Sequence, residues 1–379
     1  MNKNYLVLDV GTSGIKAIVF NSEFKIVGRS YMEMGKNITL GGAGVEQDPE
    51  EIYEVSVKVL REAVKSSGLS AEDFVGLGIT NQRETVIAWD EAGKPIYPAI
   101  VWQDTRTAAH CGRVPPAQRK MIRERTGLAN DPYFSASKIS WLLEKFPNQN
   151  FKVGTVDSWL LYRLVENNPH ITDATNASRT LLWNIINGTW DKELLEVWNV
   201  PENILPKVLP SKSNFGKLKE EVLGFSLPVL AVCGDQQASF HAASVLGTDT
   251  KITFGTGIFM VQEISELEII PGFFTTVLPS GGELRYGIEA KVAESCGPRV
   301  LPHLGKPAEL EPLMREFAED SVKAINKLSK RPTKLVVDGG VTQSELLMNF
   351  LREFLPDIEI IRQEPYDGTA LGVAFLLAK

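Results

Sequence analysis

The chain opens with three short runs of apolar and β-branched residues that are separated by turns. These runs predict strands over residues 5–10, 15–21 and 26–31. The segments between them are too short to hold crossover helices. The three strands are therefore predicted to pair as antiparallel hairpins.

A helical pattern follows the hairpins. Asp48 is the predicted N-cap, Pro49 takes the first helical position, and apolar residues then recur at helical spacing until Gly68. Further on, the pattern predicts strands near 75–80, 85–89 and 100–102. Residues 103–146 are predicted to be mostly helical. A strand at 153–156, a helix capped by Asp157 and a buried strand at 229–232 follow.

The opening pattern returns at Lys251, where KITFGTGIFMVQ again reads as strand, Gly-Thr turn and strand. A helix over 310–325 and a strand at 335–337 follow. Two halves with the same opening indicate an internal duplication, with a boundary near 236–250. We expect two domains, over residues 1–238 and 239–379.

Composition narrows the class of protein. A chain of 379 residues is longer than one hydrophobic core normally serves. Its formal net charge of -7 argues against a general nucleic-acid or anionic-membrane surface. Three scattered cysteines favour a reducing compartment over a disulfide framework. No signal peptide or membrane span is predicted, so we expect a cytoplasmic protein.

The first glycine turn, in LDVGTSGIKAIVF, is a candidate phosphate site. Its glycines allow close backbone approach, and Asp9 is placed to hold Mg²⁺ through water. The alternative is an ordinary hairpin turn, in which these residue types are common. The candidate phosphate ligands of this turn are Gly11, Thr12, Ser13 and Lys16.

Two further segments carry candidate catalytic chemistry. GITNQRETVIAWD places Arg83 and Glu84 between two strands, where they form either a polar pocket for vicinal hydroxyls or a solvated loop. VLAVCGDQQASF runs from an apolar strand into Asp235, which is either a general base at a strand end or a helix cap.

A third candidate segment, VVDGGVTQSELLMNF, combines a strand, a glycine turn and a helix. Gly339 and Gly340 let a flat base lie against the backbone, or they make an ordinary strand-to-helix turn.

Together these segments resemble the FGGY carbohydrate kinases, in the family's order and over nearly the whole chain. The segments that carry the resemblance are LDVGTSGIKA, GITNQRET, IVWQDTRT, DPYFSASKI, CGDQQA, FGTGIFM and VVDGGVTQSELL. The resemblance implies an α/β protein with the duplicated actin/hexokinase-like (RNase H-like) ATPase fold, in two domains with a cleft between them.

The resemblance also assigns roles to the matched positions. Asp235 is the implied general base, and Asp9 is the implied neighbour of Mg²⁺. The implied acceptor-binding residues are Arg83, Glu84, Trp102, Tyr133, Asp235, Gln236 and Phe259. The implied phosphate and nucleoside contacts are Gly11, Thr12, Ser13, Lys16, Gly255, Thr256, Gly257, Gly339, Gly340 and Ser344.

The implied activity is phosphorylation of a terminal hydroxyl of a small polyol by ATP and Mg²⁺. The segment around Gln82, Arg83 and Glu84 favours glycerol over a ketopentose. A kinase for another sugar or polyol, a catalytically weak ATP-binding regulator and a standalone ATPase are the alternatives. The chain lacks a long insert after Gly297 and the C-terminal extension of its relatives, which leaves donor preference and homo-oligomer formation open.

Overall fold

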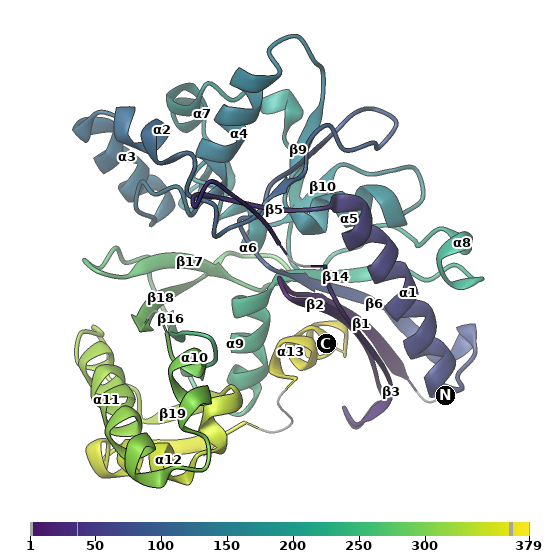
Figure 1. Ribbon diagram of the computed structural model, residues 1–379. Helices are drawn as coiled ribbons and strands as arrows, with labels where there is room; N and C mark the ends of the chain where they lie inside the picture. The colour runs from purple at the N-terminus through teal and green to yellow at the C-terminus, as the bar shows by residue number, and fades with distance from the viewer. Residues whose placement is uncertain (1–2, 36, 294, 364–366, 379) are drawn as a thin grey trace. The chain divides into compact units, whose positions relative to one another are not determined.

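The computed structural model of the protein describes residues 3–35, 37–293, 295–363 and 367–378 (Figure 1). Contacts between residues divide the chain into two compact units. Unit 1 runs from the N-terminus to Ala238 and takes in Pro279–Leu284 and the C-terminal segment from Thr369. Unit 2 holds Ser239–Leu278 and Arg285–Gly368.

The main sheet of unit 1 has five strands in the order β14-β6-β1-β2-β3. Strands β1, β2 and β3 form the predicted antiparallel hairpins, and β6 and β14 extend the sheet in parallel from β1. The bounds of these strands are β1 Asn4–Val10, β2 Gly14–Phe20, β3 Ile26–Glu33, β6 Phe74–Asn81 and β14 Val229–Gly234.

Helix α1 (Pro49–Ser67) packs against β2 and β3 and begins and ends where the sequence predicts. The Asp48 side chain accepts a hydrogen bond from the Glu50 amide, and Gly68 ends the helix in the left-handed conformation at φ 68°. The face of the helix that carries Ile52, Val59 and other apolar residues joins the core cluster on one side of the sheet.

The rest of unit 1 consists of short elements around this sheet. Three strands form the sheet β4-β5-β8, and the pairs β7–β9, β10–β13 and β11–β12 make small ribbons. The strands are β4 Ile38–Leu40, β5 Gly44–Gln47, β7 Ile87–Trp89, β8 Ala99–Ile100, β9 Lys152–Gly154, β10 Ile171–Asp173, β11 Trp183–Asn184, β12 Thr189–Trp190 and β13 Lys207–Leu209. The helices are α2 Ala108–Arg113, α3 Pro116–Thr126, α4 Ser135–Lys145, α5 Val156–Leu164, α6 Ala174–Ala177, α7 Lys192–Trp198 and α8 Glu220–Leu223.

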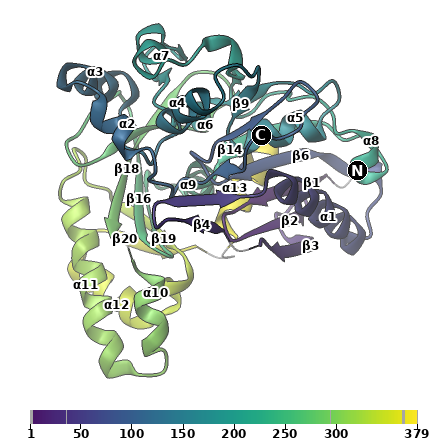
Figure 2. The same cartoon turned by 45° about the horizontal axis from the view of Figure 1, so that its top comes forward.

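Unit 2 contains a six-stranded sheet in the order β17-β18-β16-β15-β19-β20. Helices α11 and α12 lie side by side in Figures 1 and 2, and they share a core cluster with β15, β16 and β19. The elements of unit 2 are β15 Thr250–Phe254, β16 Ile258–Ile264, β17 Phe274–Leu278, β18 Arg285–Ala293, α10 Gly297–Val300, α11 Pro307–Ile325, β19 Lys334–Asp338, α12 Glu345–Phe354 and β20 Glu359–Arg362, with α9 Asp235–Val245 entering from unit 1.

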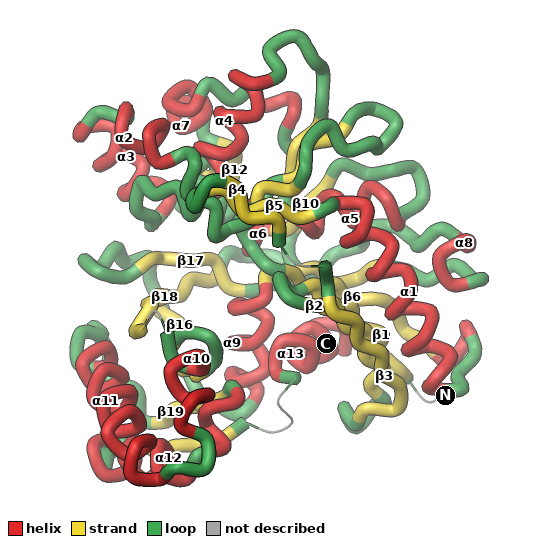
Figure 3. The backbone as a smooth tube through the Cα atoms, in the orientation of Figure 1, coloured by secondary structure: helices red, strands yellow, loops and turns green. Residues whose placement is uncertain are grey.

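The two sheets share one topology, so the predicted duplication is confirmed. In unit 1 the hairpin β1–β2 continues to antiparallel β3 on one side and to parallel β6 and β14 on the other. In unit 2 the hairpin β15–β16 continues to antiparallel β18 and to parallel β19 and β20. Strands β1 and β2 of the first hairpin and β16 of the second are labelled in Figure 3.

The compact units differ from the expected domains in two segments, because Pro279–Leu284 and the last helix belong to unit 1. Helix α13 (Gly368–Ala378) packs on the unit 1 sheet, where a Cβ atom at Gly78 would lie 2.2 Å from Val373 Cγ1. Side chains alternate between the faces of a strand, and Leu77 and Ile79 point to the α1 side. Helix α13 therefore covers the opposite face, beside β1 in Figure 1.

The start of α5 differs from its predicted position. The N-cap residue is Thr155, and Asp157 lies inside the first turn. The buried carboxylate of Asp157 accepts hydrogen bonds from the hydroxyls of Thr155 and Thr172. It is thus used as an acceptor by neighbouring side chains rather than as the helix cap.

Candidate active site

The segment after β6 is buried, which excludes the solvated-loop interpretation. Residues 81–85 are between 0% and 4% exposed. Asn81 exchanges side-chain amide hydrogen bonds with Asn176, at 3.0 and 3.2 Å. Polar side chains at such depth need partners, and the partners here are other polar side chains of unit 1.

Arg83 joins the two segments that the sequence marked for acceptor chemistry. Its Nε lies 3.2 Å from Asp235 Oδ1 and 3.9 Å from Glu84 Oε1. Its Nη1 donates to the Gln237 side chain at 3.3 Å. A Cβ atom at Gly234 would lie 2.7 Å from Arg83 Cδ, so glycine at this position gives the arginine its space.

Asp235 stands at the junction of β14 and α9, at the carboxyl end of a buried strand. Its side chain is 35% exposed, so solvent reaches the carboxylate. Burial by surrounding protein atoms raises the pKa of Asp235 to about 6, against the opposing effect of Arg83. The backbone N–H of Gln236 donates to Oδ1 at 2.7 Å. A carboxylate with this pKa is suited to accept a proton near neutral pH.

Glu84 is held in an unusual backbone conformation. Its φ of 62° lies in the left-handed region, which residues other than glycine rarely adopt. The Ser135 hydroxyl donates to the Glu84 carbonyl at 3.1 Å, and Arg179 Nε donates to Oε1 at 2.6 Å. Such outliers persist where surrounding contacts enforce them, and they cluster at functional sites.

Arg179 is a site residue that the sequence reasoning missed. It lies in the polar stretch after α6, which has no helical or strand periodicity, yet it is fully buried. The available signal was an arginine within a short polar run that also contains Asn176 and Ser178, both buried.

Trp102 and Tyr133 face each other, with ring centroids 5.6 Å apart and planes tilted by 66°. The loop that carries Tyr133 is fixed by Lys138, whose ammonium donates to the carbonyls of Pro132, Tyr133 and Phe134. Burial lowers the pKa of Lys138 to about 8. The buried ammonium of Lys138 therefore fixes the loop that places the Tyr133 ring next to Trp102.

A hydrogen-bonded chain connects Trp102 to the glycine turn of β1–β2. Trp102 Nε1 donates to Thr12 Oγ1 at 2.9 Å, and Thr12 Oγ1 donates to Gln82 Oε1 at 2.8 Å. Gln82 in turn donates to Gln47, which donates to the Thr12 carbonyl. The sequence predicted Thr12 as a phosphate ligand, whereas the structure uses its hydroxyl to join the turn to the acceptor-side segments.

Asp9 and Lys16 lie opposite each other on β1 and β2, with Nζ 3.1 Å from Oδ2. A single carboxylate next to a phosphate-binding turn suits Mg²⁺, which takes few protein ligands and keeps water and phosphate oxygens. No cluster of three His, Cys, Asp or Glu side chains able to hold a metal ion occurs within the described residues. Asp9 fits this donor set as the residue that would hold such an ion.

The turn itself is tight. The Gly11 amide donates to the Gly14 carbonyl at 3.0 Å, and a Cβ atom at Gly14 would lie 2.5 Å from the Tyr31 hydroxyl. Ser13 is exposed at the tip. Ser13 at the tip is thus the most exposed residue of the turn, and Lys16 on β2 is partly exposed.

The second glycine turn, in unit 2, is built differently. The Gly255 amide donates to the Gly257 carbonyl, while the amides of Cys296 and Gly297 donate to the carbonyls of Thr256 and Gly255. Thr256 is exposed at the tip, and Phe259 follows on β16, half-buried. Phe259 thus belongs to unit 2, while the other predicted acceptor residues belong to unit 1.

Gly339, in the segment VVDGGVTQSELLMNF, packs against Phe254, the residue directly before the second glycine turn. Its φ is 94°, and a Cβ atom would lie 2.3 Å from the Phe254 carbonyl oxygen, so only glycine fits. Gly340 begins a short 3-10 turn and has open space around its Cα. Ser344 occupies the N-cap position of α12 without a side-chain capping bond. The two unit 2 loops with predicted nucleotide contacts therefore lie side by side.

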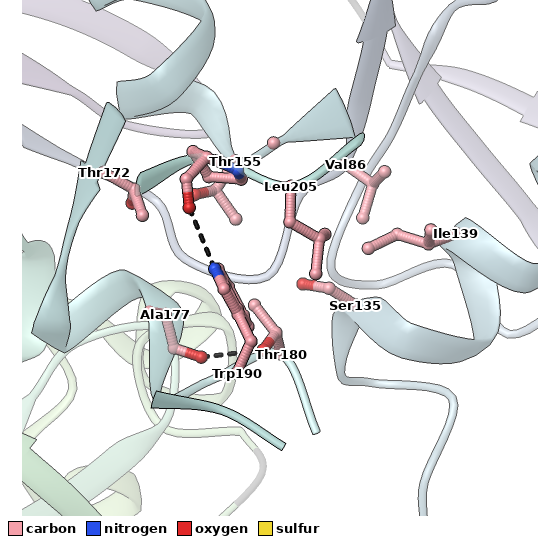
Figure 4. A pocket seen from close by; sticks show the side chains of 11 residues that line it. Val86, Ser135, Ile139, Thr155, Thr172, Ala177, Thr180, Trp190 and Leu205 are labelled. Carbon is pink, nitrogen blue, oxygen red and sulfur yellow. Dashed lines mark hydrogen bonds between the residues drawn. The ribbon is translucent and has the colours of Figure 1, made fainter. Parts of the chain in front are cut away.

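A small cavity lies elsewhere in unit 1, between Val86, Ile139, Thr172 and Trp190 (Figure 4). Its volume of about 10 Å³ is room for one water molecule. Trp190 Nε1 donates to the Pro206 carbonyl at its edge. The cavity is too small for a sugar or polyol, although Ser135, which bonds the Glu84 carbonyl, lines it.

A model of the FGGY family of carbohydrate kinases, N-terminal domain, matches residues 4–241. The glycerol kinase of Ectopseudomonas mendocina is 36% identical over 99% of this chain and 90% of its own length. The chain belongs to the FGGY family. It is a carbohydrate or polyol kinase. The glycerol kinase of Deinococcus radiodurans is likewise 36% identical, over 98% of this chain and 87% of its own length.

Solved structures agree on the fold. Plasmodium falciparum glycerol kinase with ADP superposes with a TM-score of 0.88 at 24% identity, covering 99% of this chain and 89% of that one. Xylulose kinase from Lactobacillus acidophilus gives a TM-score of 0.85 at 17% identity, over 99% and 89% of the two chains. The FGGY chain therefore has the duplicated actin/hexokinase-like ATPase fold. None of its described helices is both long and apolar enough to span a bilayer.

Proposed function

We propose that the protein transfers a phosphoryl group from ATP to a terminal hydroxyl of glycerol, with Asp235 as general base. The observation that carries this proposal is the carboxylate of Asp235, held by Arg83 at the end of β14 with a pKa of about 6. Phosphoryl transfer needs alignment and charge neutralisation, with a base to receive the proton of the attacking hydroxyl.

The acceptor is gripped by residues of unit 1 in this proposal. Arg83 and Glu84 supply a donor and an acceptor for neighbouring hydroxyls of the polyol. Trp102 offers an apolar face to its carbon chain, while the Tyr133 hydroxyl and Gln236, next to the base, supply further hydrogen bonds. The burial of residues 81–85 supports this role, because a buried polar pocket recognises hydroxyl groups more strictly than a solvated loop.

The nucleotide is held by the glycine turns. In unit 1, Gly11, Thr12, Ser13 and Lys16 form the first turn, and Asp9 is the residue that would hold Mg²⁺ through water. In unit 2, the second turn and the adenosine segment are formed by Gly255, Thr256, Gly257, Gly339, Gly340 and Ser344. ATP supplies the transferred phosphoryl group, and Mg²⁺ neutralises charge on its phosphate oxygens. Phe259, in unit 2, is the remaining residue that the family resemblance assigns to acceptor binding.

The choice of glycerol as acceptor is supported by the relatives. Two bacterial proteins that are named glycerol kinase are 36% identical to this chain over nearly its full length. The solved xylulose kinase from Lactobacillus acidophilus is 17% identical to this chain, so this likeness bears on the fold alone. Glycerol is accordingly the first acceptor to test, with ketopentoses and hexoses as competitors.

The deciding experiment is a coupled assay of ADP formation with ATP, Mg²⁺ and a panel of glycerol, other polyols and ketoses. We expect the highest kcat/KM with glycerol. A preference for a ketose would overturn the acceptor assignment and leave the kinase assignment intact. ADP formation that is independent of every acceptor would instead indicate an ATPase.

Asp235→Asn tests the base. Because the amide cannot take the proton, we expect kcat to fall by about 10² to 10⁴-fold while nucleotide binding is kept. Nucleotide affinity measured by calorimetry is the control for folding. Unchanged turnover would refute the role of Asp235.

We also infer a cytoplasmic location. All three cysteines, Cys111, Cys233 and Cys296, are free and buried, which suits a reducing compartment. Assembly into a homo-oligomer stays a prediction.

A further inference from the structure

Arg179 is a buried cation of unit 1 that has no role in the proposed mechanism. Its side chain is 1% exposed, and its Nε lies 2.6 Å from Glu84 Oε1. Its guanidinium carbon lies 5.1 Å from the centre of the Phe134 ring. It therefore contacts both the Glu84 carboxylate and the loop that carries Tyr133.

We propose that Arg179 is a positioning residue for the acceptor: it holds the Glu84 carboxylate and the Tyr133 loop in the arrangement that receives the polyol. This inference rests on the proposed function. Arg179 acts through these two partners, and the proposal assigns it no contact with the acceptor.

Glu84 lies between two guanidinium groups that compete for it. Glu84 lies between Arg179, at 2.6 Å, and Arg83, at 3.9 Å, while Arg83 lies 3.2 Å from Asp235. The charges thus alternate along the series Arg179, Glu84, Arg83 and Asp235. Without Arg179, Glu84 would draw Arg83 away from Asp235, because an unpaired buried carboxylate is costly.

Lys138 is a third cation near Glu84, and it is not a substitute for Arg179. Its ammonium already donates to three main-chain carbonyls of the loop before α4. A lysine has three donors, so this side chain is fully used in holding the loop.

The loop before α4, which carries Tyr133, is the second partner of Arg179. Arg179 stacks on Phe134, and the Ala136 amide donates to the Thr180 carbonyl at 2.8 Å. Ser135 bonds the Glu84 carbonyl. These contacts link the segment of Arg179, the start of α4 and Glu84 to one another. Of these groups, the Arg179 guanidinium alone contacts both a carboxylate and an aromatic ring, among the interactions of the described residues. Its planar shape explains the use of arginine here.

The test compares Arg179→Met, Arg179→Lys, Glu84→Gln and the double variant Arg179→Met/Glu84→Gln in steady-state assays with glycerol and ATP. We expect Arg179→Met to raise the glycerol KM by about 10- to 100-fold, with the ATP KM changed by less than about twofold. Arg179→Lys keeps the charge and should recover part of the loss. The double variant should lose less than the two single losses together, since Arg179 acts in part through the Glu84 carboxylate.

Arg163→Met is the matched control. Arg163 also pairs with a glutamate, Glu50, at 2.6 Å, and also lies over aromatic rings, those of Tyr53 and Trp159. It has no contact with the acceptor residues among the interactions of the described chain. We expect Arg163→Met to lower the melting temperature without changing the glycerol KM.

The outcomes separate the two hypotheses. Wild-type protein without turnover on any polyol would overturn the proposed function and this role with it. An active wild type, with Arg179→Met unchanged in glycerol KM or losing affinity for ATP and glycerol equally, would overturn only the role of Arg179. If Arg179→Met does not fold, the double variant, which removes both charges, and Arg179→Lys carry the comparison.

Discussion

The chemistry of Asp235 depends on opposing effects of its neighbours. Burial alone favours the neutral carboxylic acid, while the guanidinium of Arg83 favours the carboxylate. Glu84 and Asp9 add negative charge and raise the pKa further. The balance leaves a pKa of about 6, so the group is mostly ionised at neutral pH and remains a better base than an exposed aspartate.

This balance predicts the pH dependence of the reaction. The base works as the carboxylate, so kcat/KM for glycerol should be lost as pH falls through about 6 and reach its plateau above it. The profile is measured at saturating ATP and Mg²⁺. An acidic limb near pH 4, the ordinary range of an aspartate, would contradict the environment described for Asp235.

At the scale of elements, the β1–β2 hairpin carries two functions in one turn. Its tip and the Asp9–Lys16 pair are directed to phosphate in the proposed mechanism, while Thr12 is bonded to Trp102 and Gln82 on the acceptor side. The hairpin and the acceptor segments are therefore joined directly by hydrogen bonds within unit 1.

Trp102→Phe tests this link, since phenylalanine keeps an aromatic face but loses the N–H donor to Thr12. We expect kcat/KM for glycerol to fall by about 2- to 10-fold, the effect of one neutral hydrogen bond. Thr12→Val added to Trp102→Phe should cost less than the two separate losses together. Steady-state kinetics of the four proteins give the coupling.

Trp190→Phe is the control for that comparison. Trp190 Nε1 also makes one hydrogen bond of 2.9 Å, to the Pro206 carbonyl, beside the small cavity. We expect its kinetics to stay at wild-type values. Strictly additive effects at Thr12 and Trp102 would rule out the link.

At the scale of the whole molecule, the chain returns to the sheet where it began. Helix α13 lies on the face of the unit 1 sheet opposite α1, and its close approach is made possible by glycine at position 78 on β6. Phe375 of this helix also contacts Phe24, with ring centroids 4.4 Å apart. The C-terminal helix is thus part of the core of unit 1.

Gly78→Ala should therefore destabilise unit 1, because its Cβ would overlap Val373. We expect a loss of about 1–3 kcal/mol in the free energy of unfolding, typical of an overpacked core. Adding Val373→Ala should restore part of it by making room. Thermal and denaturant unfolding measure both. A Gly78→Ala protein as stable as the wild type would show that α13 does not pack closely on β6.

Some features of this protein follow from its sequence alone, because they depend on residues that are close along the chain. Alternating apolar residues and glycine turns determine both hairpins, Asp48 and Gly68 determine the ends of α1, and the repeated Gly-Thr turn reveals the duplication. The motifs also identify the FGGY family and the residues around Asp235, since these lie in short segments.

Only the tertiary structure decided the rest, because burial and pairing join residues far apart in sequence. It buried the segment of Arg83 and Glu84, turned the Thr12 hydroxyl toward Trp102, brought Arg179 to Glu84, and placed α13 in unit 1. Local patterns do not show which partner a buried arginine finds or where a last helix packs, since each is stabilised by partners that only the folded chain supplies.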